Sequence, residues 1–106
     1  MNKAINIFYV DRPISSLLDA LRSNKDDLTV NRAGDSIYVT IDRNGEHRNL
    51  SFRSDDTFTY DVNGHYFGTF AYDRDKIIAK WPQRFEPQQQ KKIIHELQSI
   101  IREELS

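Results

Sequence analysis

Residues 36–41 read Ser36-Ile37-Tyr38-Val39-Thr40-Ile41, so apolar and polar side chains alternate strictly. This period of two predicts a β-strand with one buried face. Two Asn-Gly pairs follow, at 44–45 and 63–64, each between runs rich in β-branched and aromatic residues. Because Asn-Gly tolerates the positive φ angles of a tight hairpin turn, each pair predicts a hairpin. The region from Asp27 to Trp81 therefore reads as one antiparallel β-meander.

The expected strands lie at about 27–32, 36–42, 47–53, 57–62, 65–72 and 76–81. Apolar residues between 5 and 10 add either a seventh, short strand or a helical turn, and the pattern does not decide between them. The strand at 65–72 is apolar or aromatic on both faces. Strict alternation would place Phe67 with Ala71 on one face, and Tyr66 with Phe70 and Tyr72 on the other.

Amphipathic helical patterns flank the meander. Leucine and isoleucine recur at i, i+3, i+4 and i+7 from Ile14 to Leu21, which predicts a helix at about 12–23. A second apolar stripe, from Ile93 to Leu105, predicts a helix at about 87–104. These two stripes can cover one face of the sheet, and Ile37, Val39 and Ile41 should meet them. The expected fold is α+β, with about six meander strands and both helices packed on one sheet face.

Composition limits the classes of function. A chain of 106 residues is expected to form a single domain, 1–106. The formal net charge of -1, from 15 basic and 16 acidic residues, disfavours binding driven mainly by nucleic-acid phosphates. The absence of cysteine excludes disulfides, thiolate zinc sites and cysteine nucleophiles. No apolar run reaches membrane-helix length and no signal-peptide pattern begins the chain, so we expect a cytoplasmic protein without a membrane partner.

No complete catalytic or metal-binding motif is present. The three histidines form neither an H-x-H nor an H-E-x-x-H pattern, so we predict no metal site, no cofactor and no enzymatic activity. One alternative stays open. The hairpin tip Glu46-His47-Arg48 combines a carboxylate, an imidazole and a guanidinium, which a small nuclease or phosphoesterase could use for acid–base chemistry on a phosphate.

The sheet face opposite the helices is the expected recognition surface, because Tyr38 and Thr40 should point there. The expected contact residues are Tyr38, Arg43, His47, Arg48 and Arg53, together with Tyr66 and Tyr72. Tyrosine and arginine are enriched at interaction hot spots. We therefore predict a protein-binding module, an inhibitor or immunity-type protein that neutralises a partner protein. The alternative is nucleic-acid binding, with bases stacked on the aromatic and arginine side chains. The sequence identifies neither the partner nor the oligomeric state.

Overall fold

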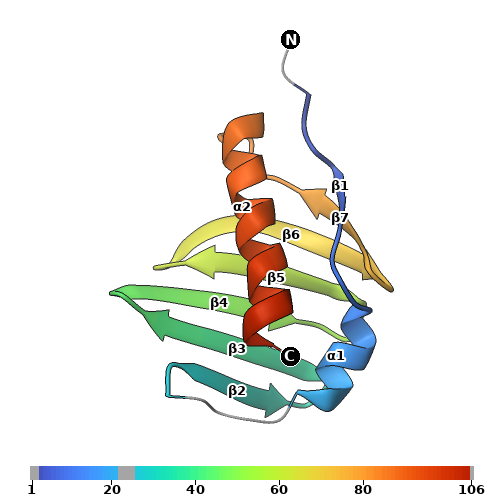
Figure 1. Cartoon of the computed structure of the whole chain (residues 1–106), viewed down its shortest axis with the longest axis vertical. Coiled ribbons are helices and arrows are strands. Elements are labelled where there is room, and N and C mark those ends of the chain that lie inside the picture. The colour runs from blue at the N-terminus through green and yellow to red at the C-terminus, as the bar shows by residue number, and fades with distance from the viewer. Residues whose placement is uncertain (1–2, 22–25, 106) are drawn as a thin grey trace.

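A computed structural model describes residues 3–21 and 26–105. Seven strands form one antiparallel sheet in the order β1-β7-β6-β5-β4-β3-β2, and the helices lie on one of its faces (Figure 1). The elements are β1 (Ile7–Tyr9), α1 (Ile14–Ala20), β2 (Leu28–Ala33), β3 (Ser36–Arg43), β4 (Glu46–Phe52), β5 (Thr57–Val62), β6 (His65–Asp73), β7 (Lys76–Lys80), α2 (Pro87–Ser99) and the π-helical turn η1 (Ile100–Glu104). The predicted α+β architecture is thus confirmed.

The strand count is seven rather than six. Strand β1 supplies the seventh by pairing antiparallel with β7, with Ile7 opposite Ile78. Two backbone bonds extend this pairing beyond the strand, from Ala79 N–H to the Asn6 carbonyl at 2.7 Å and from Val10 N–H to the Asp75 carbonyl at 2.9 Å. The N-terminal segment is therefore a strand and not a helical turn, because the last meander strand offers it an unpaired edge.

Both Asn-Gly pairs make the predicted hairpin turns. Asn44 and Gly45 have φ angles of 57° and 77°, and Asn63 and Gly64 have 52° and 82°. Two successive positive φ angles match the twist of the flanking antiparallel strands. The two hairpin tips are tied together, because Asn63 N–H donates to the His47 carbonyl at 2.8 Å and His47 N–H donates to Asn63 Oδ1 at 2.8 Å.

Helix α1 is shorter than the predicted 12–23. Its helical residues are Ile14–Ala20, and Leu21 is already extended. Arg32 of β2 reaches back to the end of this helix, where its Nη2 donates to the carbonyls of Leu18 at 3.1 Å and Leu21 at 2.6 Å. A distant arginine therefore satisfies carbonyls that another helical turn would have used. The predicted end at residue 23 lies outside the described residues.

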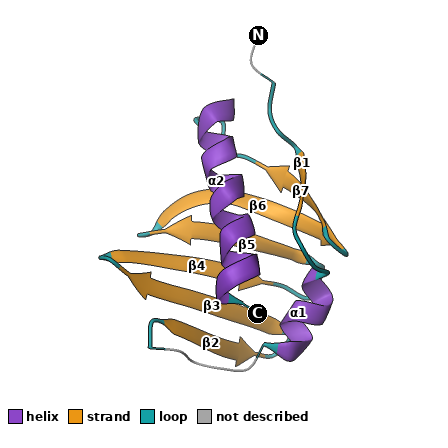
Figure 2. Ribbon diagram, viewed as in Figure 1, coloured by secondary structure: helices purple, strands orange, loops and turns teal. Residues whose placement is uncertain are grey.

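Helix α2 crosses the strands of the sheet (Figure 2). It begins with a capping box between Glu86 and Gln89, and its buried side includes Ile93, Ile94 and Leu97. The core lies between this helix and the sheet, where fully buried strand residues include Val39, Leu50, Phe52, Phe58, Tyr60 and Phe70. Among the described residues no helix lies on the opposite face, which we call the open face (Figure 1). No helix among them is long and apolar enough to cross a membrane.

One irregularity changes which aromatic side chains share a face. Tyr60 of β5 is opposite Gly68, whereas the next residue, Asp61, is opposite Tyr66, so Phe67 is an extra residue in β6. Such a bulge reverses the alternation on either side of it. The Phe67 side chain consequently packs on the helix-covered face, where its ring centroid lies 5.8 Å from that of Tyr60. Tyr66 points to the open face. The predicted grouping of Tyr66 with Phe70 and Tyr72 is therefore wrong.

Candidate functional site

The predicted contact residues divide between the two faces of the sheet. Tyr38, His47 and Tyr66 belong to the open face, because they alternate with buried residues or lie opposite open-face residues. Arg53 follows β4 and lines a hollow on this face with Tyr38. The other three, Arg43, Arg48 and Tyr72, belong to the helix-covered side. The structure therefore brings four of the seven residues onto one surface.

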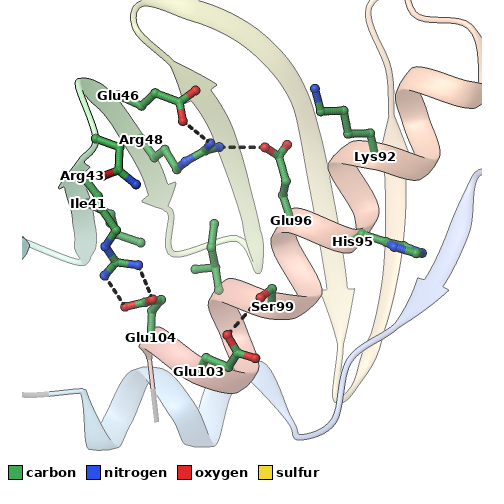
Figure 3. A pocket seen from close by; sticks show the side chains of 12 residues that line it. Ile41, Arg43, Glu46, Arg48, Lys92, His95, Glu96, Ser99, Glu103 and Glu104 are labelled. Atoms are coloured by element: carbon green, nitrogen blue, oxygen red, sulfur yellow. Dashed lines mark hydrogen bonds and ion pairs between the residues drawn. The ribbon is translucent and has the colours of Figure 1, made fainter.

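Arg48 is held firmly in the structure. Its Nη1 donates to the Tyr60 hydroxyl at 2.6 Å and to Glu96 Oε1 of α2 at 2.9 Å, while Nη2 donates to Glu46 Oε1 at 2.9 Å (Figure 3). The guanidinium joins the β3–β4 hairpin to α2. Burial raises the pKa of Tyr60 to about 12, so its phenol is neutral and accepts this bond. Arg48 therefore stabilises the contact between the sheet and α2, and its guanidinium is already bonded within the chain.

Arg43 likewise joins the β3–β4 hairpin to the helical segment, at Glu104 near its C-terminal end. Its Nη1 and Nη2 donate to the two carboxylate oxygens of Glu104 at 2.6 and 2.9 Å, and its Nε donates to Asp27 Oδ2 at 2.6 Å. A bidentate arginine–carboxylate pair fixes geometry as well as charge. This pair attaches η1 to the β3–β4 hairpin (Figure 3). Tyr72, the third covered residue, is 9% exposed and packs in the core.

A cleft of about 530 Å³ lies between the β3–β4 hairpin and the helical segment α2–η1. Its charged lining consists of Arg43, Glu46, Arg48, Lys92, His95, Glu96, Glu103 and Glu104. The donors of both arginines are largely taken by the carboxylates already described, and His95 points away from the hairpin (Figure 3). The cleft thus presents neither a concentrated positive charge for an anion nor a converging set of catalytic groups.

The alternative active site at the hairpin tip is split by strand alternation. Glu46 and Arg48 point into the cleft, whereas His47 lies on the open face and its Nδ1 contacts Asp42. The imidazole and the two groups expected to act with it therefore lie on opposite faces of the strand, whereas acid–base catalysis needs them within hydrogen-bond reach of one substrate. Within the described ranges, no group of three or more histidine or acidic side chains is arranged to hold a metal ion.

The open face collects the exposed apolar side chains. Five large hydrophobic residues are exposed in the described part of the chain: Ile7 (48%), Tyr9 (58%), Tyr38 (43%), Tyr66 (44%) and Ile78 (41%). All five lie on this face, because their strand neighbours are buried or their cross-strand partners are open-face residues. Sequence analysis missed Ile7, Tyr9 and Ile78. Consecutive apolar residues within a strand, as in Ile77-Ile78, could have indicated them. Successive side chains of a strand point to opposite faces, so one residue of each such pair must lie on the open face.

The middle of the open face is polar but largely uncharged. The strand register places Tyr38, Ser51, Thr59 and Thr69 in one row across four strands. The next row contains Thr40, Asn49, Asp61 and Tyr66. Some of these groups bond one another, as Thr40 Oγ1 does with Asn49 Oδ1 at 2.8 Å and Tyr66 does with Thr69. Hydrogen bonds between its own side chains thus hold polar groups of the open face in place, while the rings of Tyr38 and Tyr66 remain exposed.

Comparison with known proteins found no family model, no curated protein and no solved structure that matches this chain.

Proposed function

We propose that this chain is a protein-binding module that uses the open face of its sheet. One observation carries the proposal: every large hydrophobic side chain exposed in the described residues lies on this face. Scattered exposed apolar residues are ordinary, but their restriction to one face is typical of interaction surfaces. Three of the five are tyrosines, which contribute large contact area at low entropy cost.

The charge of the open face favours a protein over a nucleic acid. Within the strands, the charged side chains on this face are Asp42, Asp61, Asp73, Lys76 and Lys80. This near balance offers no stripe of positive charge for a phosphate backbone. Of the arginines expected to assist base stacking, Arg43 and Arg48 lie on the other side and bind carboxylates. Two of the three arginines expected to assist base stacking are therefore engaged elsewhere, which weakens the case for nucleic-acid binding.

The contact set that we propose is smaller than the one expected from sequence. It consists of Tyr38, His47, Arg53 and Tyr66. Tyr38 and Arg53 border a hollow of about 490 Å³ that also involves Ser51 and Thr59. A partner side chain entering this hollow would meet hydroxyl groups and an aromatic ring. We further propose an inhibitor or immunity-type role, in which this face covers the working surface of another protein and needs no chemistry of its own.

A binding experiment with matched variants tests the proposal. The bait variant Tyr38→Asp with Tyr66→Asp adds two charges to the open face. The matched control, Lys91→Asp with His95→Asp, adds the same groups to exposed positions on α2. A partner captured from cell extract by the wild-type chain should be purified and its affinity measured by calorimetry. We expect the open-face variant to bind at least about 10-fold more weakly, and the control to bind normally.

The opposite pattern would overturn the proposal. If the control loses the partner and the open-face variant retains it, the interface lies on α2. A gel shift with nucleic acid across a range of salt concentrations tests the other class of ligand. Strong, salt-sensitive binding of nucleic acid that the open-face variant abolishes would show that this face serves nucleic acid instead.

A further inference from the structure

Arg53 lies on the open face with its guanidinium unpaired. The two arginines of the β3–β4 hairpin, Arg43 and Arg48, each bond two carboxylates of the same chain. Within residues 3–21 and 26–105, by contrast, no acidic side chain forms an ion pair with Arg53 and no acceptor bonds its guanidinium. All of its N–H donors are therefore available to another molecule.

The sheet fixes the backbone from which the Arg53 side chain extends. Arg53 directly follows β4, and its own N–H donates to the Thr57 carbonyl of β5 at 2.9 Å, which continues the β4–β5 pairing by one residue. The preceding residue, Phe52, is buried in the core, so alternation directs the Arg53 side chain to the open face. A charged group on such a rigid framework loses less entropy on binding than one on a loose loop.

Hydroxyl groups surround Arg53 in the hollow of about 490 Å³. Among the described residues, no hydrogen-bond partner occupies the hydroxyls that line it, which belong to Ser36, Tyr38, Ser51, Ser54 and Thr59. The lining also includes one carboxylate, that of Asp55, whose Oδ1 already accepts a bond from Thr57 Oγ1 at 2.5 Å. The hollow thus offers one unpaired cation and several neutral hydrogen-bonding groups.

A partner that covers the open face would remove water from the Arg53 guanidinium. A buried charge without an opposite charge is strongly unfavourable, so such a partner has to supply an anion. We propose that the partner protein inserts an acidic side chain, aspartate or glutamate, into this hollow, where its carboxylate accepts a bidentate bond from Arg53. The hydroxyls of Ser51 and Thr59 can donate to the remaining lone pairs. This pairing rests on the proposed function, because only a partner that covers the open face would bury Arg53.

The charges of the hollow favour a carboxylate over a phosphate. Arg53 is the only basic residue among the described residues that line it. Proteins that bind nucleic acid usually cluster several lysines and arginines around the phosphates. The carboxylate of Asp55 in the same lining would also repel the second negative charge of a phosphate group.

An exposed apolar patch lies within reach of the same partner. Thr57, whose carbonyl bonds Arg53, lies opposite Ala71, and Ala71 lies opposite Ile78. Three strand spacings therefore separate Arg53 from Ile78, which is about 14 Å. Ile78 is 41% exposed, and its cross-strand neighbour Ile7 is 48% exposed. A protein surface with an acidic and an apolar side chain at this separation would contact both, whereas a phosphate backbone has no apolar group to offer.

A displayed library of random peptides is the probe for this pairing. The ligands of the open face are the peptides that bind the wild-type chain and fail to bind Tyr38→Asp with Tyr66→Asp. We expect these peptides to share an aspartate or glutamate, whose replacement by asparagine or glutamine weakens binding at least about 10-fold. Arg53→Glu should weaken the same peptides at least about 10-fold, with an unchanged circular dichroism melting curve because Arg53 is exposed and unpaired. Lys91→Glu, the matched control, makes the same charge change at an exposed position on α2 and should bind normally.

A charge exchange isolates the contact itself. A peptide with lysine in place of the shared acidic residue should bind Arg53→Glu at least about 10-fold more tightly than the original peptide does. Open-face peptides that share no acidic residue, or that bind Arg53→Glu as tightly as the wild type, would overturn the pairing and leave the proposed function intact. If every selected peptide still binds Tyr38→Asp with Tyr66→Asp, the proposed function and the pairing both fail. A labelled oligonucleotide that binds the wild type and not Arg53→Glu, with no acidic peptide selected, would assign the hollow to phosphate instead.

Discussion

Replacing Tyr60 by phenylalanine removes one hydroxyl from the contact between the sheet and α2. Tyr60 is fully buried, and its hydroxyl accepts a bond from Arg48 Nη1 at 2.6 Å. The same guanidinium donates to Glu96 and Glu46, both at 2.9 Å. Arg48→Met removes the guanidinium and leaves the buried hydroxyl without its donor. These two variants and their combination form a double-mutant cycle.

The structure sets the expected magnitudes. A hydrogen bond from a charged group contributes about 1.5–3 kcal/mol. We expect Tyr60→Phe to cost about 1.5 kcal/mol, at the lower end, because Arg48 keeps both carboxylates. Arg48→Met should cost about 2–3 kcal/mol, since a buried hydroxyl loses its partner. The double variant should cost little more than Arg48→Met alone, because the bond between the two groups is lost only once. The expected coupling energy is about 1–1.5 kcal/mol.

Urea unfolding followed by circular dichroism measures each free energy. The matched control is Tyr38→Phe, which removes an exposed hydroxyl and should change stability by less than about 0.5 kcal/mol. Costs of the two single variants that simply add in the double variant would refute the reasoning, because Arg48 and Tyr60 would then act independently. An Arg48→Met variant as stable as the wild type would return Arg48 to the set of possible partner contacts.

Three further predictions concern the covered side of the sheet. Because burial raises the pKa of Tyr60 to about 12, from 10.0 in the unfolded chain, the stability that its neutral phenol supplies is complete below pH 10 and is lost as the pH rises through 12. Stability of Tyr60→Phe should therefore fall less over this window, as measured by urea midpoints, and an identical decline would contradict the shift. Gly68→Ala would place a Cβ 2.9 Å from Phe70 Cζ and 3.2 Å from the Lys80 carbonyl at a φ of +149°, so it should cost about 2–3 kcal/mol in urea unfolding. No loss would mean that β7 moves aside. Leu97→Asp puts an unpaired charge at a fully buried position and should unfold the chain by circular dichroism, whereas Lys91→Asp on the exposed side of α2 should not.

The positions of the candidate contact residues could be predicted from the sequence only in part. Alternation correctly placed Tyr38 on the sheet face opposite to that of its neighbour Val39, which is buried. It did not reveal the bulge at Phe67, because that extra residue is recognised only when β6 is aligned against β5. Tyr66 and Tyr72 consequently ended on opposite faces. A bulge depends on two strands together, so no pattern within one strand determines it.

The intramolecular partners of the arginines were hidden from the sequence for a related reason. Arg48 and Arg43 were expected to contact a partner, and the residues that they bind within the chain, Glu96 and Glu104, lie 48 and 61 residues away in sequence. Only the folded chain, with α2 and η1 laid across the sheet, brings these carboxylates to the hairpin. The cleft between them, and the separation of His47 from Glu46, follow from the same arrangement.

Strands, turns and helices were determined locally, because each depends on residues within a few positions of one another. The period of two in β3, the positive φ angles at Asn44-Gly45 and the apolar stripe of α2 are of this kind. Tertiary structure alone decided the neighbour of β1, the exposed position of Ile7 and the partners of the arginines. Those features depend on which distant segments come together, and the free energy of that choice is shared among the whole set of buried side chains between sheet and helix.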